Sequence, residues 1–531
     1  MQKDAKDLLE KAISLDPNLA EAHFKLGQLN RSDQNLELAA ENFANAVNLN
    51  PNFSLAECEF GKCLCDLGQL EEARNHFLNA LEIDANFAEA YFHYGLLLIK
   101  MGDYEEAKNN FEKVTEINQN YAEAYYYKAT LLTNADEFEE AQKNYETALD
   151  IKPDFVDCYY YLGKLLAGGI ATDHEGTVID KCDFNQARDL FMKVLNLTQS
   201  HPKADYNLAK IYFGEKKFDK AAAHLESAIK QKEDYHKAHF LLGKLFFHKK
   251  NLRASELHLK ESIAIDPNQS EPYFWLGKLF YQLEKFKDAE ENFRKSSTIN
   301  DENCETHFYL AMIYRDDDDS SLSKKHFYKA LELNPEFTLA YYQLGLHTEK
   351  SGDLNEAKIH YQKATDIDQN FAEGYFALAK ISSEPSEYDQ AVRNFETAIE
   401  IDSKNSNYHY YFAELLAQGK SIEKDGTAID KSDPERAIYH YQKAIQLDVN
   451  SYRAHHRISQ IFYNKKDFFQ AYDHLQVSIE LNPNFADSHY LLAVLLMDNE
   501  AQPKLAKYID NGKNKDNCKG EKKNKIKSPQ K

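Results

Sequence analysis

The feature that most constrains this chain is a period of 34 residues. Small side chains recur at that interval at Gly27, Gly61, Gly95, Ala129 and Gly163, then at Ala209, Gly243, Gly277, Ala311, Gly345, Ala379 and Ala413, and last at Ser459 and Ala493. A period of this length, sustained along the chain, indicates repeats that bury their apolar faces against their neighbours. We therefore expect a stacked array and not a set of separate globular domains.

Each period has the internal spacing of two helices. A second small residue follows the first after twelve positions, as at Ala73, with an aromatic residue four later, as at Phe77, and another small residue three further on, as at Ala80. Spacings of three and four place these groups on one helical face. Small residues let two helices approach closely, and the aromatic ring fills the space beside them. Segments such as "LDPN" and "LNPN" then end the second helix, because Pro cannot donate the next helical hydrogen bond.

These landmarks resemble the tetratricopeptide repeat, and the resemblance extends over about residues 1–500, or some fourteen repeats. It implies an all-α fold, a right-handed α-solenoid (superhelix) of antiparallel helix pairs. The chain departs from the family at the position that usually holds Trp near the start of a repeat. Tyr91, Tyr125, His239, His307 and Glu57 stand there instead.

A longer period of 250 residues lies over the shorter one. Two intervals of 46 residues interrupt the array, and they contain the related segments "ATDHEGTVIDKCDF" and "SIEKDGTAIDKSDP". We infer two copies of a seven-repeat block, residues 1–250 and 251–500, with twelve-residue loop expansions near 169–182 and 419–432. The first copy starts on half a repeat, because residues 4–17 form a second helix without its first. Either the sequence is truncated there or something covers that face.

The two expansions have alternative interpretations. Their acidic residues and Gly echo part of a calcium-binding loop, but Cys182 and Ser432 stand where the bidentate Glu is needed. We favour structural turns that end in helix caps, Asp183 with Gln186 and Asp433 followed by Pro. No β-strand is predicted. Paired contacts with a partner remain a second possibility, with these candidates: Thr177, Asp180, Lys181, Thr427, Asp430 and Lys431.

The resemblance also implies where a partner binds, because the first helix of each repeat lines the concave groove that holds a peptide in this family. The fifth residue of nearly every repeat is aromatic, and the ninth is Lys in four successive repeats. The candidate groove residues are Tyr126, Tyr160, Lys164, Tyr206, Lys210, Phe240, Lys244, Phe274, Lys278, Phe308, Tyr342 and Phe376. One interpretation is a stripe that binds acidic or amphipathic segments. The other is that the aromatic residues fill contacts between repeats, with Lys stems over them.

Composition excludes several other classes of protein. The net charge of -22 argues against nucleic-acid binding by the repeat body, and no apolar run has the length of a membrane span. Seven scattered cysteines favour a reducing, cytoplasmic setting, with cytoskeletal, ciliary or nuclear association left open. No cofactor motif, metal site or catalytic constellation is found, and the dispersed His residues are interpreted as packing residues. Residues 501–531 form a short end segment with a Lys-rich tail, expected to be disordered from residue 511.

The sequence therefore predicts a non-catalytic scaffold or adaptor that binds peptide segments of partner proteins. The alternative is a regulatory or substrate-recruiting subunit of an enzyme complex, with the chemistry supplied by a partner. The oligomeric state is left open.

Overall fold

The computed structural model describes residues 2–132, 137–172, 178–316, 320–382, 385–422 and 427–516. It divides into two compact bodies, residues 1–279 and 280–531. Within the described ranges, no helix has the length and apolar character needed to cross a membrane.

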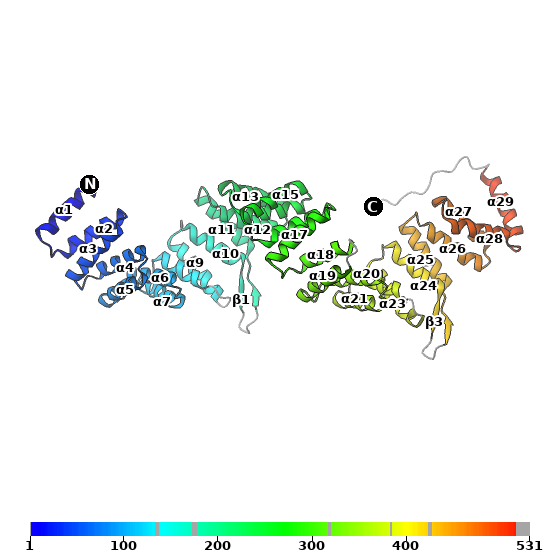
Figure 1. Ribbon diagram of the computed structural model, residues 1–531, viewed down its shortest axis with the longest axis horizontal. Helices are drawn as coiled ribbons and strands as arrows, with labels where there is room; N and C mark the ends of the chain where they lie inside the picture. Colours follow the sequence, from blue (N-terminus) through cyan, green and yellow to red (C-terminus); the bar gives the residue numbers. More distant parts are fainter. Residues whose placement is uncertain are drawn as a thin grey trace. The chain divides into compact units, whose positions relative to one another are not determined.

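The N-terminal body is a stack of helix pairs in which consecutive helices lie side by side (Figure 1). Its helices are α1 (Gln2–Leu15), α2 (Ala20–Ser32), α3 (Leu36–Leu49), α4 (Ser54–Leu67), α5 (Leu70–Ile83), α6 (Ala88–Met101), α7 (Tyr104–Ile117), α8 (Ala122–Leu131), α9 (Phe138–Ile151), α10 (Val156–Ala167), α11 (Phe184–Leu197), α12 (Pro202–Gly214), α13 (Phe218–Gln231), α14 (His236–His248), α15 (Leu252–Ile265) and α16 (Ser270–Gln282), within which the division falls. Strands β1 (Ile170–Thr172) and β2 (Val178–Asp180) lie between α10 and α11.

The C-terminal body has the same arrangement. Its helices are α17 (Phe286–Ile299), α18 (Cys304–Asp316), α19 (Ser320–Leu333), α20 (Thr338–Lys350), α21 (Leu354–Ile367), α22 (Ala372–Ile381), the short η2 (Pro385–Glu387), α23 (Tyr388–Ile401), α24 (Ser406–Gln418), α25 (Pro434–Leu447), α26 (Tyr452–Asn464), α27 (Phe468–Leu481), α28 (Ala486–Met497) and α29 (Gln502–Asp516). Strands β3 (Lys420–Ile422) and β4 (Ala428–Asp430) lie between α24 and α25. The predicted all-α solenoid of paired helices is thus confirmed, whereas the 250-residue duplication stays a prediction.

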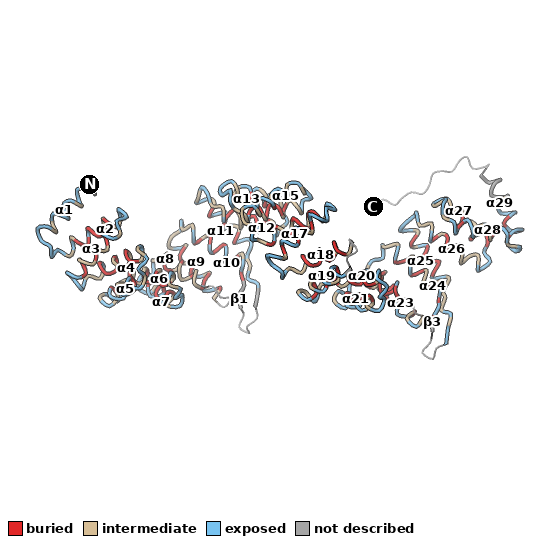
Figure 2. The backbone as a smooth tube through the Cα atoms, viewed as in Figure 1, coloured by how far each residue is buried: buried red, intermediate tan, exposed pale blue. Residues whose placement is uncertain are grey.

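The small residue of each first helix lies against the large residue of the second helix. A Cβ added to Gly95 would lie 2.8 Å from the ring of Phe111, so only hydrogen fits there without a shift. Phe111 itself is fully buried. Where Ser replaces Ala on the second helix, its hydroxyl is satisfied within the pair, since Ser255 Oγ donates to the Gly243 carbonyl oxygen at 2.8 Å. Figure 2 shows the buried residues along the helix faces that meet in this way. The predicted helix contact is confirmed.

In eight of the described helix pairs, the turn between the two helices contains one residue in the left-handed region, at Gln34, Gly68, Gly102, Lys216, Lys250, Glu284, Gly352 and Lys466. Gly68 has φ of 80° and Gly102 has φ of 91°, and each ends a first helix. Lys216 and Lys250 occupy the same place with φ of 58° and 59°. A residue with a Cβ pays roughly 1–2 kcal/mol to adopt this conformation, so the turn geometry is imposed by the packing of the two helices.

The two expansions form β-hairpins, so the prediction that the chain has no strand is wrong. Ile170 pairs with Asp180 in the first hairpin, and Lys420 pairs with Asp430 in the second, the same antiparallel register at a distance of 250 residues. Figure 1 shows each hairpin leading away from its helix pair. The strands combine β-branched residues on both sides of a short connection, a hairpin signal that the helical period obscured.

The helix that follows each hairpin begins at the N-cap residue that the sequence predicts. The Asp183 side chain accepts the backbone N–H of Gln186, and Asp433 accepts that of Arg436 with Pro434 at the start of α25. Both predicted N-caps are therefore confirmed. The carbonyl oxygen of Gly419 accepts the N–H of Lys431, and a Cβ at that glycine would overlap the backbone of Ser432.

The C-terminal end differs from the prediction. Helix α29 runs to Asp516, so disorder from residue 511 is wrong for residues 511–516, which are helical. Their backbone continues a helix that starts at Gln502, and local sequence polarity did not reveal that continuation. The remaining tail, residues 517–531, lies outside the described residues.

The helix contact predicts the effect of one added methyl group. We expect Gly95→Ala to lower the stability of the chain by about 1–3 kcal/mol, because the Phe111 ring must move out of a packed core. The matched control is Gly214→Ala, since a Cβ at that helical position meets nothing within 4 Å. Urea unfolding followed by circular dichroism measures both variants. Equal midpoints for the two variants would show that the contact is not tight.

The left-handed turn predicts a substitution that stabilises the chain. We expect Lys250→Gly to raise stability by about 0.5–1 kcal/mol, because Gly adopts φ of 59° without steric cost. The reverse change at an equivalent place, Gly68→Ala, should lower stability by a similar amount, since nothing lies within 4 Å of its Cβ and only the backbone is strained. Thermal melts of both variants test the pair. A loss of stability in Lys250→Gly contradicts the prediction.

Candidate partner-binding faces

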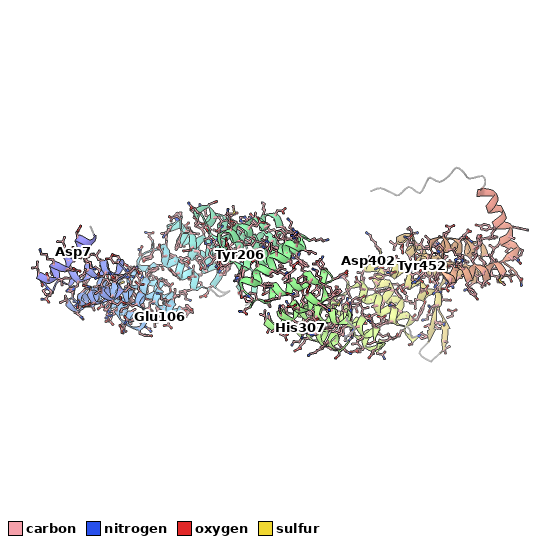
Figure 3. The ribbon with its side chains drawn as sticks, turned by 45° about the horizontal axis from the view of Figure 1, so that its top comes forward. Asp7, Glu106, Tyr206, His307, Asp402 and Tyr452 are labelled. Carbon is pink, nitrogen blue, oxygen red and sulfur yellow. The ribbon has the colours of Figure 1, made fainter. Side chains whose placement is uncertain are left out.

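The predicted fifth-position aromatic residues lie mostly between repeats. The ring centroid of Tyr126 is 4.9 Å from that of Phe155, at the start of the next repeat, and Tyr160 lies equally close to His201. Tyr206, labelled in Figure 3, lies 5.3 Å from Tyr235. These contacts favour the interpretation in which the rings join neighbouring repeats.

The remaining members follow the same pattern. Phe274 and Phe308 are about 5% exposed, and Phe240 is half-buried. The ring centroid of Tyr342 lies 5.1 Å from that of Phe371, and the ring centroid of Phe376 lies 4.8 Å from that of Tyr408. Each ring therefore offers one edge at most to a partner. A direct role of these rings in binding stays a prediction.

The predicted lysines divide into two groups. Lys164 and Lys210 are exposed, and Lys164 Nζ lies 5.4 Å from the ring centroid of Tyr161, its sixth-position neighbour. Lys244 and Lys278 are half-buried. The structure brings Lys244 and Lys278 together around a residue that the sequence analysis did not select.

That residue is Trp275, the single Trp of the chain, on α16. Lys244 Nζ and Lys278 Nζ each lie 4.9 Å from its ring centroid, one from α14 and one from α16. The Phe247 and His248 rings pack on it at 5.4 and 5.6 Å. We call these five residues the Trp275 cluster.

The electrostatic character of the Trp275 cluster is cationic. Burial, together with the nearby charges of Lys244 and Lys278, lowers the pKa of His248. The His therefore stays neutral at physiological pH while the two ammonium groups carry the charge. An aromatic surface with two cations suits a ligand that has both apolar and acidic groups.

The candidate loop residues hold the hairpins in place. Asp180 and Asp430 each accept the backbone N–H of the residue two positions later, at 2.8 Å. Hydrogen bonds from the Cys182 side chain and backbone lower the pKa of the Asp180 carboxyl group, and those from the Ser432 backbone and side chain lower that of Asp430. Lys181 pairs with Glu139 at 3.2 Å. Thr427 is exposed, and Thr177 lies outside the described residues. A partner contact by these residues stays a prediction.

Lys431 has the same role in the second hairpin. Its Nζ lies 2.8 Å from an Asp389 carboxylate oxygen, and the hydroxyl of Tyr388 donates to its carbonyl oxygen at 3.2 Å. The hairpin is thus fastened to the preceding repeat.

The His residues at the Trp-like position form pairs inside the repeats. His239 Nδ1 lies 3.2 Å from His258 Nδ1, and the same contact recurs at 2.9 Å between His455 and His474. Two further pairs are His307 with His326 and His409 with His440. In another repeat a carboxylate occupies the Trp-like position, where Glu57 Oε2 lies 2.6 Å from His76 Nδ1. These four pairs agree with the interpretation of the His residues as packing groups, and they add a polar link that the sequence did not reveal. His489, at the same position of a later repeat, is exposed and does not fit that interpretation.

The thiols of Cys58 and Cys63 are buried. Burial raises the pKa of Cys58 to about 12 and that of Cys63 to about 11, so both thiols stay protonated. Across the described residues, no three His, Cys, Asp or Glu side chains are placed to hold a metal ion.

The repeats are recognised by family models along the chain. A model described as "TPR repeat" matches residues 61–102 and 132–168. Two models described as "Tetratricopeptide repeat" match residues 20–53, 88–121, 270–303, 305–337, 339–371 and 372–405, and residues 183–270. Together these matches cover more than half of the chain. The chain belongs to the tetratricopeptide repeat family. This family consists in general of non-catalytic scaffolds for protein interactions, and the paired helices give this chain the same architecture.

Three solved structures illustrate what the chain is similar to. The APC/C hetero-tetramer Cut9–Hcn1 aligns over 93% of this chain and 93% of that chain, with 18% identity and a TM-score of 0.36. The yeast Tom70 aligns over 92% and 99%, with 16% identity and a TM-score of 0.34. YrrB, a TPR protein with an unusual peptide-binding site, aligns over 40% and 99%, with 24% identity and a TM-score of 0.32. These similarities carry no conclusion about function, and no curated protein matches the sequence.

The His pairs predict a dependence of stability on pH. Burial and the neighbouring His474 lower the pKa of His455 to about 4, below its unfolded value of about 6.5. As pH falls through this window, the unfolded chain binds protons before the folded chain does, so stability is lost between about pH 6.5 and 4. Thermal melts at a series of pH values measure this loss.

A variant separates the pair from other acid effects. Tyr and Asn occupy the paired positions in another repeat, at Tyr125 and Asn144. We therefore expect the double substitution His455→Tyr/His474→Asn to reduce the loss of stability on acidification while leaving the neutral-pH melt close to that of the parent. An unchanged pH dependence would show that the pair does not titrate as described.

Proposed function

We propose that this chain is a non-catalytic scaffold or adaptor whose first-helix face binds acidic or amphipathic peptide segments of partner proteins. Membership in the tetratricopeptide repeat family supports the scaffold role. The proposal assigns the main contact of the N-terminal body to the Trp275 cluster, because it combines an aromatic surface with two cations. A cytoplasmic setting belongs to the same proposal.

The arrangement of the Trp275 cluster supports this assignment physically. Its residues come from two successive first helices, α14 and α16, so a segment that crosses both helices contacts all of them. Aromatic anchors flanked by cations are typical of surfaces that bind with appreciable energy. An acidic residue on the segment interacts with Lys244 and Lys278, and an apolar neighbour packs on the indole ring.

The single Trp supplies the measurement. We expect a short helical peptide of Glu and Leu to change the fluorescence of Trp275 on titration into the full chain, and a Lys and Leu peptide of equal length to change it far less. The double variant Lys244→Gln/Lys278→Gln should bind the acidic peptide about tenfold more weakly, because both local cations are removed.

The matched control removes two charges elsewhere. Lys230 and Lys237 are exposed on α13 and α14, so Lys230→Gln/Lys237→Gln changes the net charge equally without changing the cluster. Its affinity for the peptide should stay within about twofold of the parent. If both double variants lose the same affinity for the acidic peptide, the loss reflects the overall charge of the chain. That outcome would contradict the assignment to the Trp275 cluster.

A further inference from the structure

The C-terminal body contains two adjoining cavities beside its hairpin. Their volumes are about 450 and 430 Å³, and both are lined by Tyr410, Arg453 and Arg457. The walls come from the first helices α22, α24, α26 and α28, and from β3 at Lys420. We call the two cavities together the hairpin groove. Tyr452, labelled in Figure 3, marks the start of α26 on its wall.

The hairpin groove is cationic in a strongly acidic chain. Its lining carries four cations, Lys380, Lys420, Arg453 and Arg457, against two carboxylates, Glu414 and Asp487. The chain as a whole has a net charge of -22. A local excess of positive charge therefore distinguishes this groove from the average surface and favours an anionic ligand.

The guanidinium group of Arg457 is held in position by its neighbours. Arg457 Nε lies 2.7 Å from Glu414 Oε1, and Arg457 Nη1 donates to the side-chain oxygen of Gln460 at 3.0 Å. The hydroxyl of Tyr441 donates to the same Glu414 oxygen at 2.7 Å. This chain of contacts fixes Arg457 without filling the groove.

Arg453 is more open. It is exposed, its Nε donates to the hydroxyl of Tyr452 at 3.2 Å, and it lies 5.7 Å from that ring. In the described part of the chain, no carboxylate lies within ion-pair distance of it. One turn of α26 separates Arg453 from Arg457, so the two present their donors to the same groove.

The twelve-residue expansion contributes a wall to the groove. The ion pair of Lys431 with Asp389 and the hydrogen bond from Tyr388 fasten the hairpin to α23. This places Lys420 beside the cavity. The positions 250 residues earlier hold Lys203, Asn207 and Ile170 in place of Arg453, Arg457 and Lys420. The N-terminal hairpin therefore keeps one of these three cations, as Lys, and has neither guanidinium group.

We propose that the hairpin groove binds an extended segment of a partner protein through a phosphorylated side chain of that segment. A carboxylate has two oxygens and one charge, which one guanidinium satisfies. The lining holds two guanidiniums and two ammonium groups against two carboxylates. Lys380 is paired with Glu349 at 3.2 Å, so the remaining excess is one positive charge. A phosphate monoester, with about -2 and three acceptor oxygens, can use this charge and the planar donors of both Arg453 and Arg457. Tyr411 and Tyr490, which are 37% and 73% exposed, provide ring surfaces for the residues that flank the phosphate.

This inference rests on the proposed scaffold role but not on the Trp275 cluster. The two sites lie in different bodies and share no residue. The Trp fluorescence therefore reports on one site, and the part of the labelled-peptide binding that is lost in Arg453→Gln reports on the other. If the hairpin groove does not bind the phosphorylated peptide, the result for the Trp275 cluster is unaffected. If the Trp275 cluster does not bind the acidic peptide, the result for the hairpin groove is likewise unaffected.

The test compares three fluorescein-labelled peptides by anisotropy on the full chain. They share one acidic sequence and carry phosphoserine, Ser or Glu at the central position. We expect the phosphoserine peptide to bind at least about tenfold more tightly than the Ser peptide, and clearly more tightly than the Glu peptide. Equal affinity of the phosphoserine and Glu peptides would assign the groove to plain acidic segments and overturn the proposal.

Substitutions locate the binding. Arg453→Gln should weaken the phosphoserine peptide by about tenfold, and Arg453→Lys should recover only part of the loss, because Lys keeps the charge without the planar fork. Arg453 is exposed, so neither change opens the core. The control is Arg393→Gln on α23, an exposed Arg whose guanidinium donates to Gln390. Unchanged affinity in Arg453→Gln, or an equal loss in the control, overturns the proposal.

Discussion

The structure depends on one contact, repeated along the chain, between a small residue of a first helix and a large residue of the second. At Gly95 and Phe111 the approach leaves no room for a Cβ. The close distance brings the two helices into contact along their length, and in eight of the described pairs the turn that joins them contains a left-handed residue. Because each pair leaves an apolar face uncovered, the pairs must stack. Helix pairing, turn geometry and stacking thus follow from the same spacing.

Because the repeats stack in this way, most of the fifth-position aromatic side chains pack between neighbouring repeats. The fifth-position rings join one repeat to the next, as Tyr126 does with Phe155. Specificity must then come from positions that the packing leaves open. Trp275 occupies the sixth position of its repeat, and Arg457 occupies the sixth position of another. The same backbone site carries an aromatic anchor in one body and a cation in the other, so partner preference can change from repeat to repeat while the core stays constant.

Sequence reasoning predicted what depends on short, regular spacings. The helix pairs, the small-to-aromatic contact and the caps at Asp183 and Asp433 all follow from residues a few positions apart. The strands were missed because β1 and β2 are only three residues long and interrupt a strong helical period. The Trp275 cluster could not be predicted, since Lys244 and Trp275 belong to different repeats and meet only when α14 and α16 stack. The pairing of His455 with His474 is hidden for a related reason, because the two helices must fold back before their rings meet.

The two hairpins show how the chain accommodates an insertion while the helix pairs keep their packing. Each leaves its helix pair at the same backbone contacts, with Gly169 or Gly419 accepting the N–H of Lys181 or Lys431. The hairpins therefore add a wall beside the first helices without changing how those helices pack. Whether that wall creates a site depends on the residues that face it. Asn207 stands at the N-terminal position equivalent to Arg457, and Tyr160 accepts a long hydrogen bond of 3.4 Å from that Asn. A neutral amide in place of a guanidinium removes one charge and the planar donor fork, while Lys203 keeps a charge at the position of Arg453. The two matching hairpins therefore stand beside surfaces with different hydrogen-bond donors.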